Sequence, residues 1–382
     1  MYEENIEMLR LGFDDEYDRQ RYLDNKISVN KKMSRIYAKS RQRAKHQTCY
    51  ICKKECSSFC NSHSVPKFCL KRVATEGKVY MSGIQAEFPV LGEDNGVNDA
   101  GTFHLICREC DGTLFQDYEN PGAYAKIPTG KMLAQIVMKN YLLMISKRFE
   151  ERALYSIMAE QFHAYDYAMH HIEIIDLDLV EYESEFKRAK IAGAGNHDDW
   201  YYLCYYQQLD YVVPFAFQGP IVMVSDFEDN VINDIYNMSP DYHTKDIHIA
   251  VFPLEKTSIV MMIVDSREKR YRKFYKQLKK LPLQEQLSAI NYIIFSYSEN
   301  VFISKNIGDK VLKNKYFLEA CQKCNVAVSD HPFGDALSAA IREFSLSKRK
   351  DVRGGRPSSA AVYVPCPSSC RRKPVHPSRI SA

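Results

Sequence analysis

The sequence predicts an α+β fold in which a cysteine-rich segment is followed by helices and then by an antiparallel sheet. Three observations lead to this class. Residues 46–125 hold closely spaced cysteines among short alternating runs, residues 128–175 repeat apolar side chains every three and four positions, and residues 200–265 contain apolar runs of strand length. The first pattern is typical of a small metal-stabilised segment, the second of long helices and the third of β-hairpins.

The N-terminal region, residues 1–45, has an acidic and a basic part. Residues 1–25 are acidic, whereas residues 26–54 contain ten Lys or Arg and no Asp or Glu. Residues 26–45 also lack Pro and Gly, so we expect them to form a helix. A solvated helix face and a phosphate-binding face both fit this pattern. The residues assigned to nucleic-acid binding in the second case are Lys31, Lys32, Arg35, Lys39, Arg41, Arg43 and Lys45.

The remaining chain divides at changes of composition. Residues 126–192 are expected to be helical and to end at the break "GAGNHDD" (193–199). Residues 193–347 are expected to form an α+β domain with an antiparallel sheet. The tail, residues 348–382, is rich in Pro, Ser and Arg and is expected to be disordered.

Within the predicted α+β domain, apolar runs flank "DFEDN" (226–230) and "PLEKT" (253–257). Each pattern indicates a hairpin, because two strand-length runs surround a short polar connection. Residues 266–281 and 282–302 then have helical patterns, and the two helices are expected to separate before Pro282.

The net charge of +4 is unevenly distributed along the 382 residues. The tail has nine Lys or Arg and one Asp, whereas residues 1–347 have 43 basic and 47 acidic side chains. The main body is therefore slightly acidic, and only the local basic run favours nucleic acid as a partner. The N-terminus has no apolar signal region, and "IVMMIV" (259–264) is too short to span a bilayer. We therefore expect a cytoplasmic protein that does not contact membranes.

The cysteine spacing predicts a structural zinc site. In a reducing compartment, Cys-x-x-Cys pairs are more often metal ligands than disulfides. The pairs Cys49/Cys52 and Cys107/Cys110 supply the four thiolates that a closed tetrahedral zinc site requires. Other cysteines are weaker candidates. Cys56 and Cys60 either compete for the same ion or lie nearby without binding it, and Cys321/Cys324 and Cys366/Cys370 are isolated pairs.

Between the two thiol pairs stands the sequence Ser62-His63-Ser64-Val65-Pro66-Lys67. This order over residues 49–119 resembles the HNH endonuclease superfamily, in the branch whose motif is Ser-His-x-x-Pro-Lys. The resemblance implies a treble-clef zinc fold carrying a ββα-metal site. It also implies that His63 is a general base that activates water for hydrolysis of a phosphodiester. A separate divalent ion, Mg²⁺ or Mn²⁺, would stabilise the developing charge.

The chain departs from the family pattern at three positions. Ser62 stands where a metal-ligating Asp is expected, and Asp111 stands where an Asn is expected after the second cysteine pair. The final His ligand is missing, and Asp117 and Glu119 are the carboxylates that could replace it as Mg²⁺ ligands. His63 therefore has two further interpretations, as a residue that caps the zinc loop or as a zinc ligand itself. We expect His104 to be a strand residue, and His170 and His171 to lie on a helix surface.

Two functions fit these patterns. The first is an HNH-like, metal-dependent nuclease that acts on DNA or RNA, with the basic helix along the phosphate backbone and His63 in the reaction. The second is a non-catalytic, zinc-stapled binding or regulatory protein whose degenerate motif is inert. In that case residues 193–347 are the module for a protein partner. The sequence lacks the glycine-rich phosphate loops and nucleophile elbows of other enzyme classes.

Overall fold

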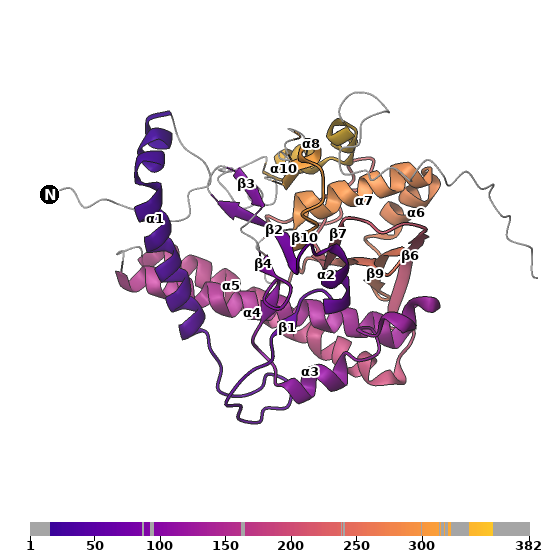
Figure 1. Cartoon of the computed structure of the whole chain (residues 1–382), viewed down its shortest axis with the longest axis horizontal. Coiled ribbons are helices and arrows are strands. Elements are labelled where there is room, and N and C mark those ends of the chain that lie inside the picture. The colour runs from indigo at the N-terminus through magenta and orange to yellow at the C-terminus, as the bar shows by residue number, and fades with distance from the viewer. Residues whose placement is uncertain are drawn as a thin grey trace, which may run out of the picture.

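The structure is a computed structural model that describes residues 16–353 apart from several short gaps. The gaps are residues 86–87, 92–94, 162–164, 238, 240, 299, 313, 315–316, 318–319 and 322–335. The described part has an α+β fold, in which helices cover both faces of a large antiparallel sheet (Figure 1). Cys324, Cys366 and Cys370 lie outside the described residues, as does the predicted tail beyond residue 353.

The large sheet combines strands from distant parts of the chain. Its strand order is β3-β2-β10-β7-β8-β9-β6, and β4 also pairs with β2. All of these pairings are antiparallel. A hairpin of the cysteine-rich segment thus continues the sheet of the C-terminal region, because β2 pairs with β10. The strands are β2 (Lys78–Gln85), β3 (Phe88–Leu91), β4 (Asn95–Gly96), β6 (Tyr201–Leu209), β7 (Phe215–Ile221), β8 (Ile247–Pro253), β9 (Ser258–Asp265) and β10 (Val301–Ile303).

Alternating side chains of the central strands form a core on each face of the sheet. On β8, Ala250 and Phe252 belong to one core, and Ile249 and Val251 belong to the other. The first core includes two long helices and the cysteine-rich segment, and the second includes the helices that follow β9 (Figure 1). These helices are α4 (Gly130–Gln161), α5 (Tyr165–Ile191), α6 (Arg272–Lys280) and α7 (Leu283–Tyr297). The predicted helix break is confirmed, since Pro282 is the N-cap residue of α7.

One of the two predicted hairpins forms in full. Strands β8 and β9 pair along their length, and the Leu254 N–H donates to the Thr257 carbonyl at 2.8 Å in the connection. The predicted hairpin around residues 226–230 is reduced to a single bridge between Ser225 and Val231. The Asp226 carboxylate accepts hydrogen bonds from nearby N–H groups of residues 228 and 230, so this segment closes as a side-chain-capped turn.

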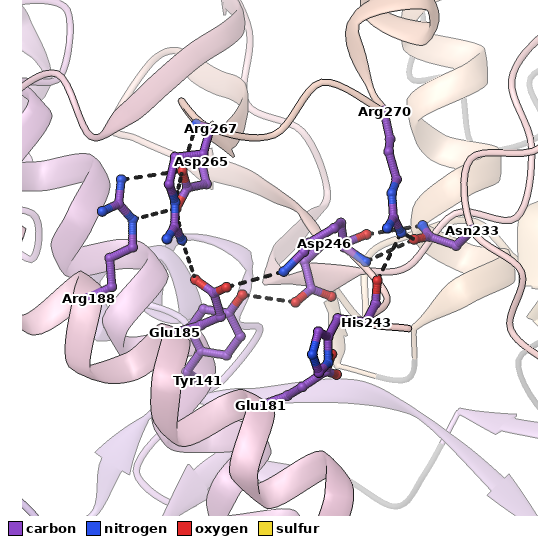
Figure 2. Close-up of polar contacts among 11 residues, drawn as sticks. Tyr141, Glu181, Glu185, Arg188, Asn233, His243, Asp246, Asp265, Arg267 and Arg270 are labelled. Carbon is purple, nitrogen blue, oxygen red and sulfur yellow. Dashed lines mark hydrogen bonds and ion pairs between the residues drawn. The ribbon is translucent and has the colours of Figure 1, made fainter. Parts of the chain in front are cut away.

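Polar contacts fix helix α5 to the ends of two central strands of the sheet (Figure 2). Arg188 of α5 donates to the Asp265 carboxylate at the end of β9, with a shortest distance of 2.6 Å. One turn earlier on α5, Glu185 contacts Lys245 at 3.4 Å, just before β8. Because these side chains lie within two turns of one helix, they set the position of α5 relative to the sheet.

Helix α1 (Glu16–Arg43) is longer than the predicted helix, which begins at residue 26. No Pro or Gly interrupts residues 16–43, so the helical conformation extends toward the N-terminus. Its buried contact is made by Ile36, which packs against Leu154, Ile157 and Met158 of α4. The helix lies across one end of the α4–α5 pair (Figure 1).

The cysteine-rich segment contains short elements around the predicted site. Strand β1 (Ser62–His63) pairs with β5 (Thr102–Phe103) in a separate two-stranded sheet. The helices of this segment are α2 (Lys67–Val73), α3 (Arg108–Leu114) and the 3₁₀ turn η1 (Pro121–Ala125). The other short elements are the π-helical turn η2 (Ala192–Asn196), α8 (Asp309–Leu312), α10 (Ala336–Phe344) and the 3₁₀ helix η3 (Leu346–Arg353). Over the residues described, no helix is both long and apolar enough to span a bilayer.

Candidate metal centre and the polar site beside it

The four predicted zinc ligands converge on one point. The Sγ atoms of Cys49, Cys52, Cys107 and Cys110 all lie within 4.8 Å of one another, and those of Cys52 and Cys107 are 3.9 Å apart. A tetrahedral ion with metal–sulfur bonds of about 2.3 Å has sulfur–sulfur edges of roughly 3.8 Å. The cluster therefore has dimensions that suit a metal ion such as Zn²⁺.

Tight turns place the first pair of sulfurs. The Lys53 N–H donates to the Cys49 carbonyl, and the Cys49 N–H donates to the Lys54 carbonyl, both at 2.9 Å. Lys53 takes a left-handed backbone conformation, with φ of 61°, to close this turn. The Tyr50 N–H donates to the Leu105 carbonyl at 3.0 Å, so the turn is joined directly to the bend between β5 and the second cysteine pair.

Backbone N–H groups are directed at the sulfur atoms. The Cys107 N–H donates to Cys49 Sγ at 3.3 Å, and the Cys110 N–H donates to Cys107 Sγ at 3.4 Å at the start of α3. Burial raises the pKa of Cys49, but hydrogen bonds from Cys52 and Cys107 oppose it, and the pKa falls to about 6. Thiolates are the metal-binding form of cysteine, so these contacts favour the ligand state of Cys49. Burial and the neighbouring sulfur atoms raise the pKa of Cys110, so in the absence of an ion the cluster holds its protons unevenly.

Cys56 and Cys60 do not belong to this cluster. Cys56 Sγ contacts the Lys54 carbonyl at 3.4 Å, and Cys60 Sγ donates to Asp111 Oδ2 at 3.3 Å. Burial and the adjacent Asp111 raise the pKa of Cys60 to about 11, which keeps it a thiol. Of the two roles open to these cysteines in the sequence, the structure places them as neighbours of the site and not in the cluster.

His63 lies at the end of β1 with its ring held by a main-chain carbonyl. Its Nε2 is 2.9 Å from the Val97 carbonyl oxygen. A carbonyl only accepts, so Nε2 carries the proton and Nδ1 retains its lone pair. Burial lowers the pKa of the half-buried imidazole, and the nearby Lys67 and Lys139 lower it further. His63 is therefore neutral at pH 7, and it is not part of the four-sulfur group.

A buried lysine lies next to His63 and was missed by the sequence analysis. Lys139, in the N-terminal third of α4, has a fully buried side chain. Its Nζ contacts Ser62 Oγ at 2.8 Å, Asp111 Oδ1 at 2.7 Å and Glu119 Oε1 at 3.0 Å. Nζ also lies 3.8 Å from the centre of the Phe115 ring. The only signal in the sequence is a single lysine in the apolar run "AQIVMKNYLL" (134–143).

Asp111 is the second residue that the sequence analysis left outside its site. In addition to Lys139, its carboxylate accepts from Ser62 Oγ at 2.6 Å and from Cys60. Burial opposes ionisation, but Lys139 and the hydroxyl of Ser62 together lower the pKa of Asp111. Asp111 directly follows Cys110, so the start of α3 carries both a candidate metal ligand and this carboxylate.

The two carboxylates proposed from the sequence as Mg²⁺ ligands face α4. Asp117 contacts Lys131 at 2.9 Å and accepts from Gln135 at 2.7 Å. Glu119 contacts Lys139, as described above, and accepts from the Tyr118 hydroxyl at 3.3 Å. The described contacts of both carboxylates are therefore with α4 and with neighbouring residues, and their role in metal binding stays a prediction.

The basic residues assigned to nucleic-acid binding lie on α1 or just after it. All seven are exposed: Lys31, Lys32, Arg35, Lys39, Arg41, Arg43 and Lys45. Arg43 forms a two-pronged contact with Glu160 of α4, at 2.8 and 2.9 Å. Lys39 and Arg43 line a shallow hollow between α1 and α4. Phosphate contact by these residues stays a prediction.

The other three histidines considered in the sequence, His104, His170 and His171, lie outside the four-sulfur group. His104 follows β5, and its Nε2 is 2.9 Å from Asn61 Oδ1 on the exposed side of the cysteine-rich segment. His170 and His171 lie on α5, where the His171 ring stacks on Tyr155.

Comparisons with protein-family models, with curated proteins and with solved structures found no match to this chain.

Proposed function

We propose that residues 46–125 form an HNH-like treble-clef unit held by Zn²⁺ on Cys49, Cys52, Cys107 and Cys110. In this proposal the protein hydrolyses phosphodiester bonds, with His63 as the general base. The observation that carries the assignment is the hydrogen bond from His63 Nε2 to the Val97 carbonyl. It orients the ring and leaves Nδ1 as the proton acceptor, which is what a base for water activation requires.

The polarity of the site fits this role. The pKa of His63 is lowered, so the imidazole is in the neutral form that can accept a proton at pH 7. Because its ring is only half-buried, water can approach it. In the proposed reaction Nδ1 takes a proton from water, the water oxygen forms a bond to phosphorus, and the bond from phosphorus to the leaving oxygen breaks. The leaving oxygen takes up a proton from solvent water, and His63 later returns its own proton to solvent.

The substrate is proposed to be DNA or RNA. Helix α1 presents its exposed Lys and Arg residues beside α4, and charges of this kind bind phosphates without reading base sequence. The four-cysteine cluster and His63 belong to the segment that directly follows α1 in the chain.

A divalent ion of the kind that the family resemblance implies does not fit the polar site as it stands. Ser62, at the expected ligand position, shares the Lys139 ammonium with Asp111 and Glu119. These oxygens surround a nitrogen at hydrogen-bond distances of 2.7 to 3.0 Å. Magnesium requires oxygen ligands at about 2.0–2.1 Å. We therefore derive no step through such an ion.

The test is cleavage of supercoiled plasmid and of single-stranded RNA by zinc-loaded protein, with and without Mg²⁺. His63→Ala is compared with His104→Ala, which removes an imidazole from the exposed side of the same segment. We expect His63→Ala to lose cleavage by at least about 100-fold and His104→Ala to retain it. Zinc content and far-UV circular dichroism establish that both variants are folded. Equal cleavage by wild type and His63→Ala would overturn the assignment.

One observation favours the second candidate function, a non-catalytic binding protein stapled by zinc. The two carboxylates of the polar site, Asp111 and Glu119, share the single positive charge of the buried Lys139, so both are already engaged by a side chain of this chain. Under this alternative, wild type and His63→Ala bind DNA or RNA, or a protein partner through residues 193–347, with equal affinity and cleave neither nucleic acid. Cleavage that depends on His63 excludes it.

A further inference from the structure

The buried ammonium of Lys139 has a complete set of oxygen partners. An ammonium has three N–H donors. In the structure three oxygens surround Nζ, one each from Ser62, Asp111 and Glu119. They come from β1, from α3 and from the segment after α3, so one cation joins three separate pieces of the cysteine-rich segment to α4.

This arrangement has the composition of a cation site. Two carboxylates and a hydroxyl converge, and the Phe115 ring covers another side of the cation at 3.8 Å. When ionised, the two carboxylates contribute two negative charges, and the Lys139 ammonium contributes one positive charge. The Lys139 side chain is fully buried, so its Nζ meets these oxygens away from bulk water.

The place of this cation relative to His63 is the basis of the inference. Ser62 immediately precedes His63 on β1, and its hydroxyl bonds both to Lys139 and to Asp111. Lys139 also lies close enough to lower the pKa of His63 by its charge. We propose that the Lys139 ammonium replaces a divalent cation in the polar site beside His63, so that the wild-type site binds no Mg²⁺ or Mn²⁺. Identifying this place with the position of a catalytic ion rests on the proposed function, whereas the exclusion of the ion rests on the contacts alone.

A direct consequence is that removing the ammonium creates a divalent-cation site. Lys139→Ala vacates the volume of the side chain and leaves the Asp111 and Glu119 carboxylates facing each other without a counter-charge. Hard divalent cations prefer such oxygen ligands. A bound Mn²⁺ would restore the neutralisation that the lysine gave, and it would stabilise the folded form of the variant by mass action.

The experiment measures Mn²⁺ binding to zinc-loaded, full-length protein by electron paramagnetic resonance, with thermal unfolding as a second readout. Wild type is compared with Lys139→Ala and with Lys139→Ala combined with Asp111→Asn. We expect no saturable Mn²⁺ binding to wild type below about 1 mM. We expect Lys139→Ala to bind one Mn²⁺ and to unfold at a higher temperature when Mn²⁺ is present. The double variant should bind Mn²⁺ at least about 10-fold more weakly than Lys139→Ala.

Two results would overturn the proposal. One is wild-type binding of one Mn²⁺ that is lost in Asp111→Asn or Glu119→Gln, because the ion would then coexist with the lysine. The other is a folded Lys139→Ala that neither binds Mn²⁺ nor is stabilised by it. If Lys139→Ala does not fold with or without Mn²⁺, the wild-type titration decides alone. None of these readouts uses nuclease activity, so failure of the proposed function would be seen separately, in the cleavage assay.

Discussion

The substitution Lys139→Met tests whether the buried ammonium stabilises the fold. Methionine keeps most of the apolar volume of the lysine but removes the charge, so Asp111 and Glu119 lose their shared partner. Lys139 is 0% exposed, and the Asp111 and Glu119 side chains are 17% and 32% exposed, so little water can reach the carboxylates to replace the hydrogen bonds of the ammonium. Breaking a buried ion pair by removing one partner costs about 3–5 kcal/mol. We expect the free energy of unfolding to fall by an amount in this range.

The decrease in the free energy of unfolding caused by Lys139→Met should depend on pH. In wild type, with Lys139 beside it, the pKa of Asp111 is lowered, so this carboxylate stabilises the fold above its ordinary pKa and loses that contribution as the pH falls. In Lys139→Met the unpaired carboxylates favour their protonated forms. The difference between wild type and variant should therefore be larger at about pH 7.5 than at about pH 5.

Lys131→Met is the matched control, because it removes a second lysine of α4 that contacts a carboxylate of the same segment. Lys131 is 38% exposed and its partner Asp117 is 37% exposed. Exposed pairs contribute roughly 0–1 kcal/mol. Urea unfolding of zinc-loaded protein at both pH values provides the comparison. If the two substitutions cost the same, or if Lys139→Met costs less than about 1 kcal/mol, the buried cluster is not the structural centre described here.

Three further predictions concern other parts of the molecule. Cys107→Ser should abolish stoichiometric zinc binding and lower the melting temperature by several degrees, because metal binding supplies folding free energy to this segment; an unchanged zinc content in the purified variant would count against the four-sulfur site. Burial raises the pKa of Asp246 to about 7, so its protonated form stabilises the fold and that contribution is lost as pH rises from about 4 through 7. Asp246→Asn should therefore stabilise the protein at about pH 8 and change its stability little at about pH 4. Asp265→Asn, which breaks a 2.6 Å ion pair, should destabilise the protein at about pH 8. Urea unfolding at both pH values measures each effect, and a change of the same sign in the free energy of unfolding of both variants at the higher pH would refute the assignment. Gly130→Ala should destabilise the start of α4 by about 1–3 kcal/mol, because its Cβ would lie 2.1 Å from the Asp198 carbonyl oxygen; thermal unfolding measures the effect, and a stabilised variant would contradict the close approach.

Local patterns in the sequence were sufficient for several elements of the fold. The β8–β9 hairpin and the α6–α7 break follow from alternation and from a proline, both of which act within a few residues. In these two cases the signal and the structure lie in the same short segment. The sulfur cluster was predicted from the two-residue spacer within each cysteine pair, although the two pairs that it joins are separated along the chain, with Cys52 and Cys107 lying 55 positions apart.

Long-range contacts were outside the reach of the same patterns. The pairing of β2 with β10 joins residues more than 200 positions apart, and the sequence of neither strand indicates which strand it pairs with. Lys139 has the same limitation: its partners Ser62, Asp111 and Glu119 are set by how α4 packs on the cysteine-rich segment. A lysine in an apolar helical run does not show by itself which carboxylates lie around it, and Lys139 was not among the predicted site residues.

His63 shows the same division between local and distant information. Its place between two cysteine pairs was visible in the sequence, whereas the Val97 carbonyl that holds its ring comes from a turn 34 residues later. The position of Asp111 directly after Cys110 was visible in the sequence, but its contact with Ser62, next to His63, depends on how β1 packs against α3.

The most direct test of His63 as the base is chemical rescue of phosphodiester cleavage. His63→Gly removes the imidazole and leaves space for a small molecule, so free imidazole in the buffer should restore a measurable part of the cleavage that the variant loses. Because the pKa of His63 is lowered, the wild-type rate should be constant around neutral pH and should fall only at a pH below the ordinary pKa of histidine. Rescue of His63→Gly by imidazole, with His104→Gly cleaving at the wild-type rate, is the predicted result. Cleavage by His63→Gly at the wild-type rate without imidazole, or no cleavage of DNA or RNA by the wild-type protein, would contradict the account.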